Sequence, residues 1–258
     1  MFLAVSLAVP TGACSSSDST GASGGEVVDG GESVVVDAAA ADANDGGTDA
    51  QIDGDASFVP GTVVFSDDFS DGNLADDWDV LTVANGTTAE IDMGAFHVKT
   101  KVIAAQEADF AHLRKTVPGA PSRVRLSFSA TFPSTTFTKG SMAIATVDVS
   151  NNHFFTLWLR DTDSSAPAAS LEEISLSGTK RNVLGSPPPT NVATKIVVDI
   201  DLAAGTASVT WDATKALDAA AIQKGTTEDP TIRVGAVYDY GPQDAFEAHF
   251  DDVVLEYY

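Results

Sequence analysis

The sequence predicts an all-β protein in which an antiparallel two-sheet β-sandwich follows a disordered N-terminal tail. Apolar and polar residues alternate with a period of two in many short segments after residue 59. Glycine and other turn-forming residues separate these segments, as they do between antiparallel strands. The segment 14–58 is rich in Asp, Ser, Gly and Ala and contains no Lys or Arg. Such a composition cannot bury enough apolar surface to offset the entropy lost on ordering.

The N-terminus combines a short apolar run, residues 1–13, with Cys14, which is the only cysteine of the chain. Small polar residues follow it. The pattern resembles a bacterial lipoprotein signal peptide, and the resemblance implies that Cys14 is lipidated and becomes the mature N-terminus. It also implies a lipid anchor at the outer membrane or cell surface, the only contact with the membrane. Acyl chains hold a protein on a bilayer through their buried methylene groups.

Two features depart from the usual signal peptide. No Lys or Arg precedes Lys99, and Thr11 stands where an aliphatic residue is usual. The first feature leads us to expect a translation start upstream of Met1. The alternative interpretation is a secreted or cytosolic protein with a buried Cys14.

The segment 14–58 is predicted to be a disordered acidic tether. Its like charges repel one another and keep the chain extended. The whole chain has a formal net charge of −23, with 37 acidic and 14 basic residues. Such a protein is repelled by nucleic acid, so we expect no nucleic-acid partner. Without a second cysteine the domain has no disulfide and no cysteine-based metal site.

The segment 59–258 is long enough for one domain with a substantial core. Its clearest strand is 123–132, in which Val124, Leu126 and Phe128 face the core while Arg123 and Arg125 face away. Residues 203–206 predict a hairpin connection. The Ala-rich segment 214–224 is compatible with one short helix, which the pattern leaves open. The predicted strands are 62–66, 95–103, 109–117, 123–132, 141–149, 153–160, 169–177, 195–202, 207–212, 231–239 and 246–257.

The two ends of the domain resemble a known family. The first strand leads into Asp67-Asp68-Phe69-Ser70-Asp71-Gly72, and the last strand contains Phe250-Asp251-Asp252-Val253. These segments resemble the concanavalin A-like lectin/glucanase jelly roll, in its laminin G-like and laminarinase-like branches. The resemblance implies that the first and last strands lie side by side in one sheet.

The same resemblance implies a structural calcium ion where the terminal strands meet. Asp68, the carbonyl group of Gly72 and Asp251 are the expected ligands, since calcium prefers oxygen. Regular alternation places Asp251 on the same inward face as Val253 and Leu255, where a carboxylate needs a partner. The alternative is that backbone amides or arginines satisfy Asp68 and Asp251 without a metal ion.

No residue pattern indicates catalysis, and we expect the protein not to be an enzyme. Laminarinase-like hydrolases carry their two catalytic glutamates in the motif Glu-x-Asp-x-x-Glu. The segment that begins with Glu90-Ile91-Asp92 matches the first half of this motif, but Ala95 replaces the second glutamate. Adjacent Glu172 and Glu173 point to opposite faces of a strand and cannot share one bond. The histidines show no metal-binding spacing, so we expect His97, His112, His153 and His249 to be isolated.

A glycan-binding surface is the remaining hypothesis. In the strand 153–160, burial of Phe155 and Leu157 leaves Trp158 and Arg160 on the opposite face. Aromatic rings stack on the C–H faces of sugars, so Trp158, Arg160, Tyr238 and Tyr240 are the candidate ligand-binding residues. The alternative is that Trp158 packs under the proline-rich loop 186–189.

The sequence therefore predicts a surface-anchored, non-catalytic recognition module for a glycan or a surface protein. Two alternatives remain open. One is a carbohydrate-active enzyme whose site carries no recognisable motif, and the other is a purely structural envelope lipoprotein.

Overall fold

A computed structural model describes residues 61–74, 77–84, 86–102, 109–133, 140–161, 168–185, 188–240 and 244–258 of the chain. All of them belong to one compact unit. Cys14 and the segments 1–13 and 14–58 lie outside the described residues. The lipid anchor, the tether and the domain boundary at residue 59 therefore stay predictions.

The described part of the chain consists of β-strands and contains no helix, hence none long and apolar enough to cross a membrane. The strands are β1 (Thr62–Asp67), β2 (Val80–Val83), β3 (Thr88–Asp92), β4 (Ala95–Lys99), β5 (Ala111–Thr116), β6 (Arg123–Thr131), β7 (Ser141–Ser150), β8 (His153–Asp161), β9 (Ala168–Ser175), β10 (Gly178–Gly185), β11 (Thr194–Asp201), β12 (Thr206–Trp211), β13 (Thr214–Ala221), β14 (Thr231–Tyr240) and β15 (Glu247–Tyr257).

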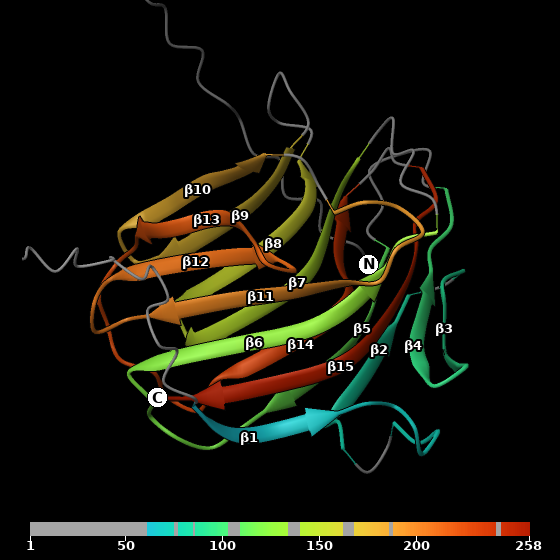
Figure 1. Ribbon diagram of the computed structural model, residues 1–258, viewed down its shortest axis with the longest axis horizontal. Helices are drawn as coiled ribbons and strands as arrows, with labels where there is room; N and C mark the ends of the chain where they lie inside the picture. Colours follow the sequence, from blue (N-terminus) through green and yellow to red (C-terminus); the bar gives the residue numbers. More distant parts are fainter. Residues whose placement is uncertain are drawn as a thin grey trace, which may run out of the picture. The chain divides into compact units, whose positions relative to one another are not determined.

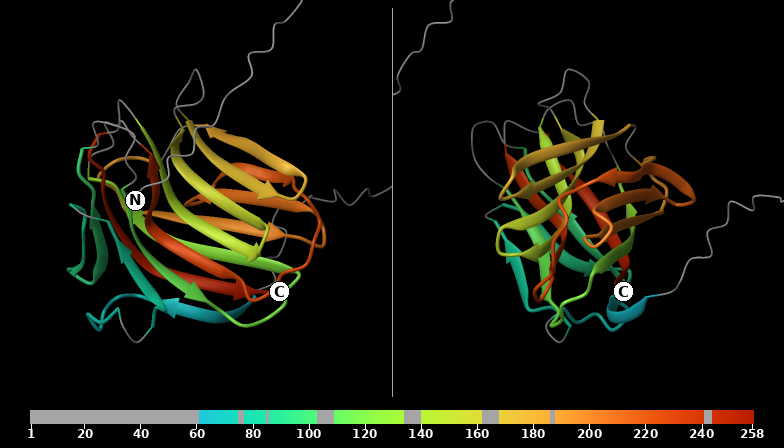
Figure 2. Two further views of the ribbon diagram at one scale, coloured as in Figure 1. Left: turned by 180° about the vertical axis from the view of Figure 1, so that it is seen from behind. Right: turned by 90° about the vertical axis from the view of Figure 1, so that its left-hand side faces the viewer.

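These strands form two antiparallel sheets that pack face to face as a sandwich (Figures 1 and 2). The eight-stranded sheet has the order β13-β12-β11-β6-β15-β4-β3, and β1 also pairs with β15. The seven-stranded sheet has the order β10-β9-β8-β7-β14-β5-β2. The predicted fold class is confirmed, and so is the expected pairing of the first strand with the last.

The core lies between the two sheets and is built from the inward positions of the alternating strands. Val124, Leu126 and Phe128 of β6 are fully buried, as predicted. The Phe250 ring of β15 packs 6.0 Å from Phe128 and 6.4 Å from Phe96, measured between ring centroids. These rings join several strands of the eight-stranded sheet into one apolar layer that the seven-stranded sheet covers.

The prediction missed or mistook four strands. β2, β3 and β10 were not predicted, because two are very short and the third contains few apolar residues. The Ala-rich segment 214–224, compatible with a helix, forms strand β13 instead. Its backbone pairs with β12 through two register shifts, and the Ser208 hydroxyl accepts a hydrogen bond from the Ala219 amide. Pairing with a neighbouring strand here outweighs the helix propensity of alanine.

Candidate functional site

A cleft of about 720 Å³ lies on the face of the seven-stranded sheet that points away from the core. Strict alternation along β8 produces it. Phe155 and Leu157 are buried in the core, whereas Thr156 and Trp158 line the cleft. Phe154 of the same strand also lines the cleft, and the neighbouring strands complete its wall with His112, Thr146, Asp148, Glu172, Ile174, Thr231, Arg233 and Tyr238.

Trp158 and Tyr238 form an aromatic corner in this cleft. Their rings meet edge to face, with centroids 6.0 Å apart and an interplanar angle of 89°. The Trp158 indole donates a hydrogen bond of 3.1 Å to Glu172 Oε2, which fixes the orientation of the ring. Tyr238 stays 45% exposed. The structure therefore places Trp158 in the wall of the cleft.

Two arginine–carboxylate pairs flank the aromatic corner. Arg181 Nη2 lies 2.8 Å from Glu172 Oε1, the carboxylate oxygen that does not bind Trp158. Arg233 Nη1 lies 2.7 Å from Asp148 Oδ2 and also donates to the Thr146 hydroxyl. Charged groups held in this way offer hydrogen-bond donors and acceptors whose orientation is set before any ligand arrives.

His112 also lines the cleft. Its Nδ1 atom is buried without a hydrogen-bond partner among the described residues. Burial lowers the pKa of His112 to about 4, and the positive charges of Arg233 and Arg114 contribute to this shift. The imidazole is therefore neutral at neutral pH and has an unused polar nitrogen.

Sequence reasoning found part of this cleft and missed the rest. Trp158 and Tyr238 meet as candidate residues. Arg160 and Tyr240 belong to strands β8 and β14, but their side chains lie outside the described part of the structure. Asp148 and Arg233 were not singled out, and Glu172 was considered only as a catalytic residue. Their positions follow from strand register, which pairs Thr146 with both Arg233 and Thr156 and pairs Thr156 with Glu172.

The predicted calcium region differs from the expected arrangement, and the reason is a β-bulge in β15. The register with β6 shifts between Asp251 and Val254, and Asp252 has a φ of 49°. Before the bulge Phe250 points inward, and after it Val253 does. One extra residue reverses the alternation. Asp251 is therefore not on the inward face with Val253, and that prediction was wrong.

The buried carboxylate of this region is Asp67 rather than Asp68. Asp67 Oδ1 accepts a hydrogen bond from the Phe69 amide at 2.7 Å, and Oδ2 accepts one from the Trp78 indole at 2.6 Å. Asp68 and Gly72 are both exposed. The Asp68 carboxylate accepts a hydrogen bond from the Ser70 amide, and the Asp251 carboxylate accepts one from the Asp252 amide. Backbone amides therefore satisfy both carboxylates in part.

Calcium nevertheless stays a testable prediction. Burial raises the pKa of Asp251, and the charges of Asp252, Asp68 and Asp67 raise it further, a repulsion that a cation would relieve. If Asp68, Gly72 and Asp251 hold calcium, adding calcium chloride to EDTA-treated, dialysed protein at 100 times Kd stabilises it by about 2.7 kcal/mol. Thermal unfolding followed by circular dichroism measures this change, and an unaltered midpoint would rule out the site.

The segment compared with hydrolases lies away from the cleft. Glu90 and Asp92 belong to β3, at the edge of the eight-stranded sheet. Glu172 and Glu173 do face opposite sides of β9. Glu172 lines the cleft, whereas Glu173 is buried and lies 2.9 Å from His153 Nε2.

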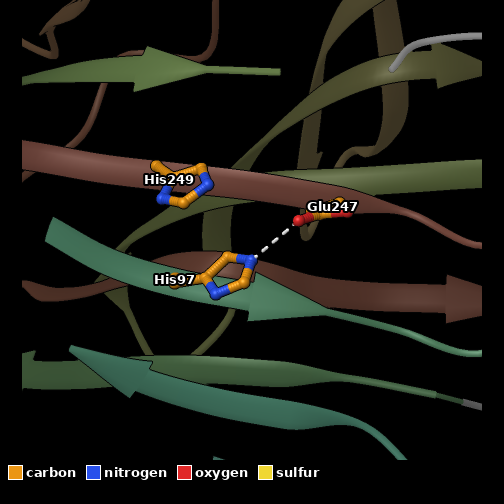
Figure 3. Close-up of side chains that lie close together, drawn as sticks. All are labelled: His97, Glu247 and His249. Atoms are coloured by element: carbon orange, nitrogen blue, oxygen red, sulfur yellow. Dashed lines mark hydrogen bonds and ion pairs between the residues drawn. The ribbon is translucent and has the colours of Figure 1, made fainter. Parts of the chain in front are cut away.

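Two histidines that we expected to be isolated lie together. His97 of β4 and His249 of β15 are directly opposite each other in the eight-stranded sheet. Their rings stack with centroids 4.3 Å apart and an interplanar angle of 5°, and His97 Nε2 lies 3.0 Å from Glu247 Oε1 (Figure 3). The signal in the sequence was Glu247-x-His249, which places both side chains on one face of a strand.

No protein-family model matches this chain, and no curated protein matches it in sequence. Solved structures do match its fold. Domain 4 of AbnA, a GH43 extracellular arabinanase from Geobacillus stearothermophilus solved with arabinotriose, has a TM-score of 0.52 at 12% identity. The match covers 77% of this chain and 94% of that domain.

Two further structures show the same architecture. Cip1, a cellulose-induced protein, has a TM-score of 0.56 at 11% identity, and the match covers 74% of this chain and 96% of Cip1. A Bacillus subtilis protein of unknown function with a galectin-like fold has a TM-score of 0.53 at 8% identity, with coverage of 77% and 97%. The chain spans only 19% of a matched sialidase. At these identities the similarity concerns the fold alone, and that fold is a lectin-like β-sandwich of the jelly-roll type.

Proposed function

We propose that this domain is a non-catalytic module that binds a glycan in the cleft of the seven-stranded sheet. The observation that carries the proposal is the aromatic corner of Trp158 and Tyr238, set beside the arginine–carboxylate pairs of Glu172 and Asp148. A sugar ring presents a C–H face to an aromatic side chain and hydroxyl groups to charged ones. This cleft offers both kinds of surface within one wall.

The arrangement of the polar groups favours hydroxyl recognition. The carboxylate of Glu172 is held by Trp158 and Arg181, and the carboxylate of Asp148 is held by Arg233. Anchored carboxylates accept hydrogen bonds from hydroxyl groups with little further loss of side-chain freedom.

The same pairs argue for binding without hydrolysis. Glycosidases use two carboxyl groups, one of which must carry a proton to donate to the leaving oxygen. In the described part of this cleft, Glu172 and Asp148 are each paired with an arginine, so the two carboxylates have similar surroundings. A glycosidase instead gives its two carboxyl groups different surroundings, one for the acid and one for the nucleophile or base.

The fold comparison is compatible with glycan binding. The matched arabinanase domain was solved with arabinotriose bound, and it has the same sandwich architecture. We infer that this chain too binds a polysaccharide, and that a lipid on Cys14 holds the domain at the cell surface. The anchor and the location are part of the proposal and rest on the sequence pattern alone.

Replacement of Trp158 by alanine tests the proposal. We expect the unsubstituted protein to bind at least one polysaccharide on a glycan array that includes arabinans and β-glucans. Trp158→Ala should bind that ligand at least about tenfold more weakly, because the stacking surface is lost and Glu172 loses its indole donor. Trp158→Phe keeps an aromatic ring and should fall between the two. Calorimetry with the best array ligand provides the affinities.

Leu176→Ala is the matched control, because Leu176 is 82% exposed and does not line the cleft. It should bind as the unsubstituted protein does. An array on which no glycan binds would contradict the proposal and favour a structural envelope role. Release of reducing sugar from the bound polysaccharide would contradict the non-catalytic part and favour an enzyme.

A further inference from the structure

We propose that His97, Glu247 and His249 bind one divalent transition metal ion, with zinc as the best match, on the outer face of the eight-stranded sheet. The proposal is independent of the glycan cleft, which lies on the other sheet. It stands on strand register, on the distances between the ligand atoms and on the chemistry of the donor set.

Strand register brings the three side chains to one face. His97 pairs directly with His249 across β4 and β15, and Glu247 lies two residues before His249 on the same strand. The intervening Ala248 and the following Phe250 are fully buried in the core. The three ligand side chains therefore point away from the core and toward one another (Figure 3).

The distances are close to those of a zinc site. The ligand atoms of the three residues lie within 4.8 Å of one another, and His97 Nε2 is 3.0 Å from Glu247 Oε1. Zinc bonds of about 2.0–2.2 Å in a tetrahedron place neighbouring ligand atoms about 3.3 Å apart. The carboxylate and His97 already meet this condition. The His249 ring would need to turn and approach by about 1.5 Å at most.

The donor set selects the class of metal. Two imidazole nitrogens and one carboxylate oxygen suit zinc, whereas calcium takes oxygen ligands. Three protein ligands leave a fourth position for water. The His97 side chain is 14% exposed and that of Glu247 is 33% exposed, so solvent reaches the site from one side.

The neighbouring charges partly favour a cation and partly oppose it. Glu90 Oε1 lies 3.8 Å from Nδ1 of His97, the ring nitrogen that does not face Glu247. No hydrogen bond forms at this distance, but a small movement of the exposed Glu90 side chain would let it accept one from Nδ1, the contact that orients a ligating histidine. Lys99 Nζ lies 3.6 Å from Oε2 of Glu247 and competes with a metal ion. The Lys99 side chain is 58% exposed, which leaves it free to move away.

Zinc chloride titrated into the full chain by calorimetry tests the site. We expect one zinc ion per chain with a Kd in the micromolar range or tighter. Glu247→Gln and His249→Gln should each weaken binding at least tenfold, because each removes one of three ligands. Lys99→Gln should strengthen binding severalfold, since it removes the competing ammonium group. A histidine pair that only stabilises the sheet would give neither result.

Nuclear magnetic resonance of the unsubstituted protein makes the test independent of how the variants fold. Zinc should shift the ring nitrogen signals of His97 and His249 and leave those of His112 and His153 unchanged. The latter two histidines are an internal control, because neither belongs to the cluster. Absence of saturable binding, equal affinity in His249→Gln, or shifts at His112 and His153 instead would overturn the proposal.

Discussion

Replacing Asp199 by asparagine should lower the free energy of unfolding by about 3 kcal/mol at pH 7, although Asp199 belongs to neither proposed site. Asp199 of β11 receives two bonds from Arg123, of 2.7 Å to Oδ1 and 2.6 Å to Oδ2. Arg125 donates to the same carboxylate at 2.5 and 3.0 Å. One carboxylate therefore compensates two guanidinium groups.

Burial makes this network costly to break. The Arg125 side chain is only 3% exposed, because the Tyr258 ring lies 4.8 Å from its guanidinium carbon and the Tyr258 hydroxyl accepts a hydrogen bond from it. Glu256 lies 3.6 Å away and compensates only in part. Loss of one partner from a buried ion pair typically costs about 3–5 kcal/mol. The side-chain amide introduced by Asp199→Asn can still accept a hydrogen bond, which places the expected loss at the lower end.

Urea unfolding of Asp199→Asn and of Asp218→Asn gives a matched comparison. Asp218 forms an exposed pair with Lys215, both side chains being more than 60% exposed, so its loss should cost less than about 1 kcal/mol. Similar losses in the two variants would show that burial of the Asp199 network contributes little.

The effect of Asp199 should also depend on pH. Burial acts to raise the pKa of Asp199, but the hydrogen bonds from Arg123 and Arg125 outweigh it, so the net pKa lies below 3.8. A carboxylate whose pKa is lower in the folded state than in the unfolded state stabilises the protein at any pH above its unfolded-state pKa. That stabilisation is lost as the pH falls through the folded-state pKa. The difference between the unsubstituted protein and Asp199→Asn should therefore shrink as the pH falls below 3.8.

Gly235→Ala should be comparably destabilising, by about 3 kcal/mol, because two costs add up. Gly235 of β14 has a φ of 129°, which side-chain-bearing residues rarely adopt. A Cβ atom there would lie 2.5 Å from the Ala111 carbonyl oxygen and 3.0 Å from the His112 Cα atom of strand β5. Both contacts are with backbone, so relief requires the two strands to separate.

Gly178→Ala separates the two costs. Gly178 has a similar φ of 120°, but a Cβ atom there meets nothing within 4 Å. It should therefore show only the backbone strain, about 1–2 kcal/mol. Thermal and urea unfolding of both variants measure the difference. Equal losses of unfolding free energy in the two variants would indicate that β5 and β14 separate to admit the methyl group at no measurable cost. Because β14 also carries Arg233 and Tyr238, Gly235→Ala is expected to weaken glycan binding as well.

Much of the fold was predictable because alternation is a local property. Strand β6 was predicted from the alternation in its own amino-acid sequence, and the residues predicted to face inward are buried. Local signals failed where pairing overrides propensity. The segment 214–224 is rich in alanine, yet its edge position beside β12 makes it a strand. The bulge at Asp251 and Asp252 is another case, because one inserted residue takes Asp251 off the inward face on which Val253 lies.

The candidate cleft was half predictable for the same reason. Trp158 could be assigned to the face opposite Leu157 by counting along β8. The sequence did not reveal that Glu172 and Arg233 line the same cleft as Trp158. Their proximity to Trp158 depends on the register of β8 with β9 and of β7 with β14. The free Nδ1 of His112 depends on burial by neighbouring strands, which no local pattern reports.

The amino-acid sequence by itself determined that this chain forms sheets, where most strands lie and which side chains of regular strands such as β6 and β8 face the core. Those properties depend on residues one or two positions apart. The folded molecule decided which outward side chains become neighbours. His97 and Glu247 lie 150 positions apart in the chain, and only the order and register of the strands bring their polar atoms within 3.0 Å. Long-range pairing sets such contacts, so alternation along a single strand does not reveal them.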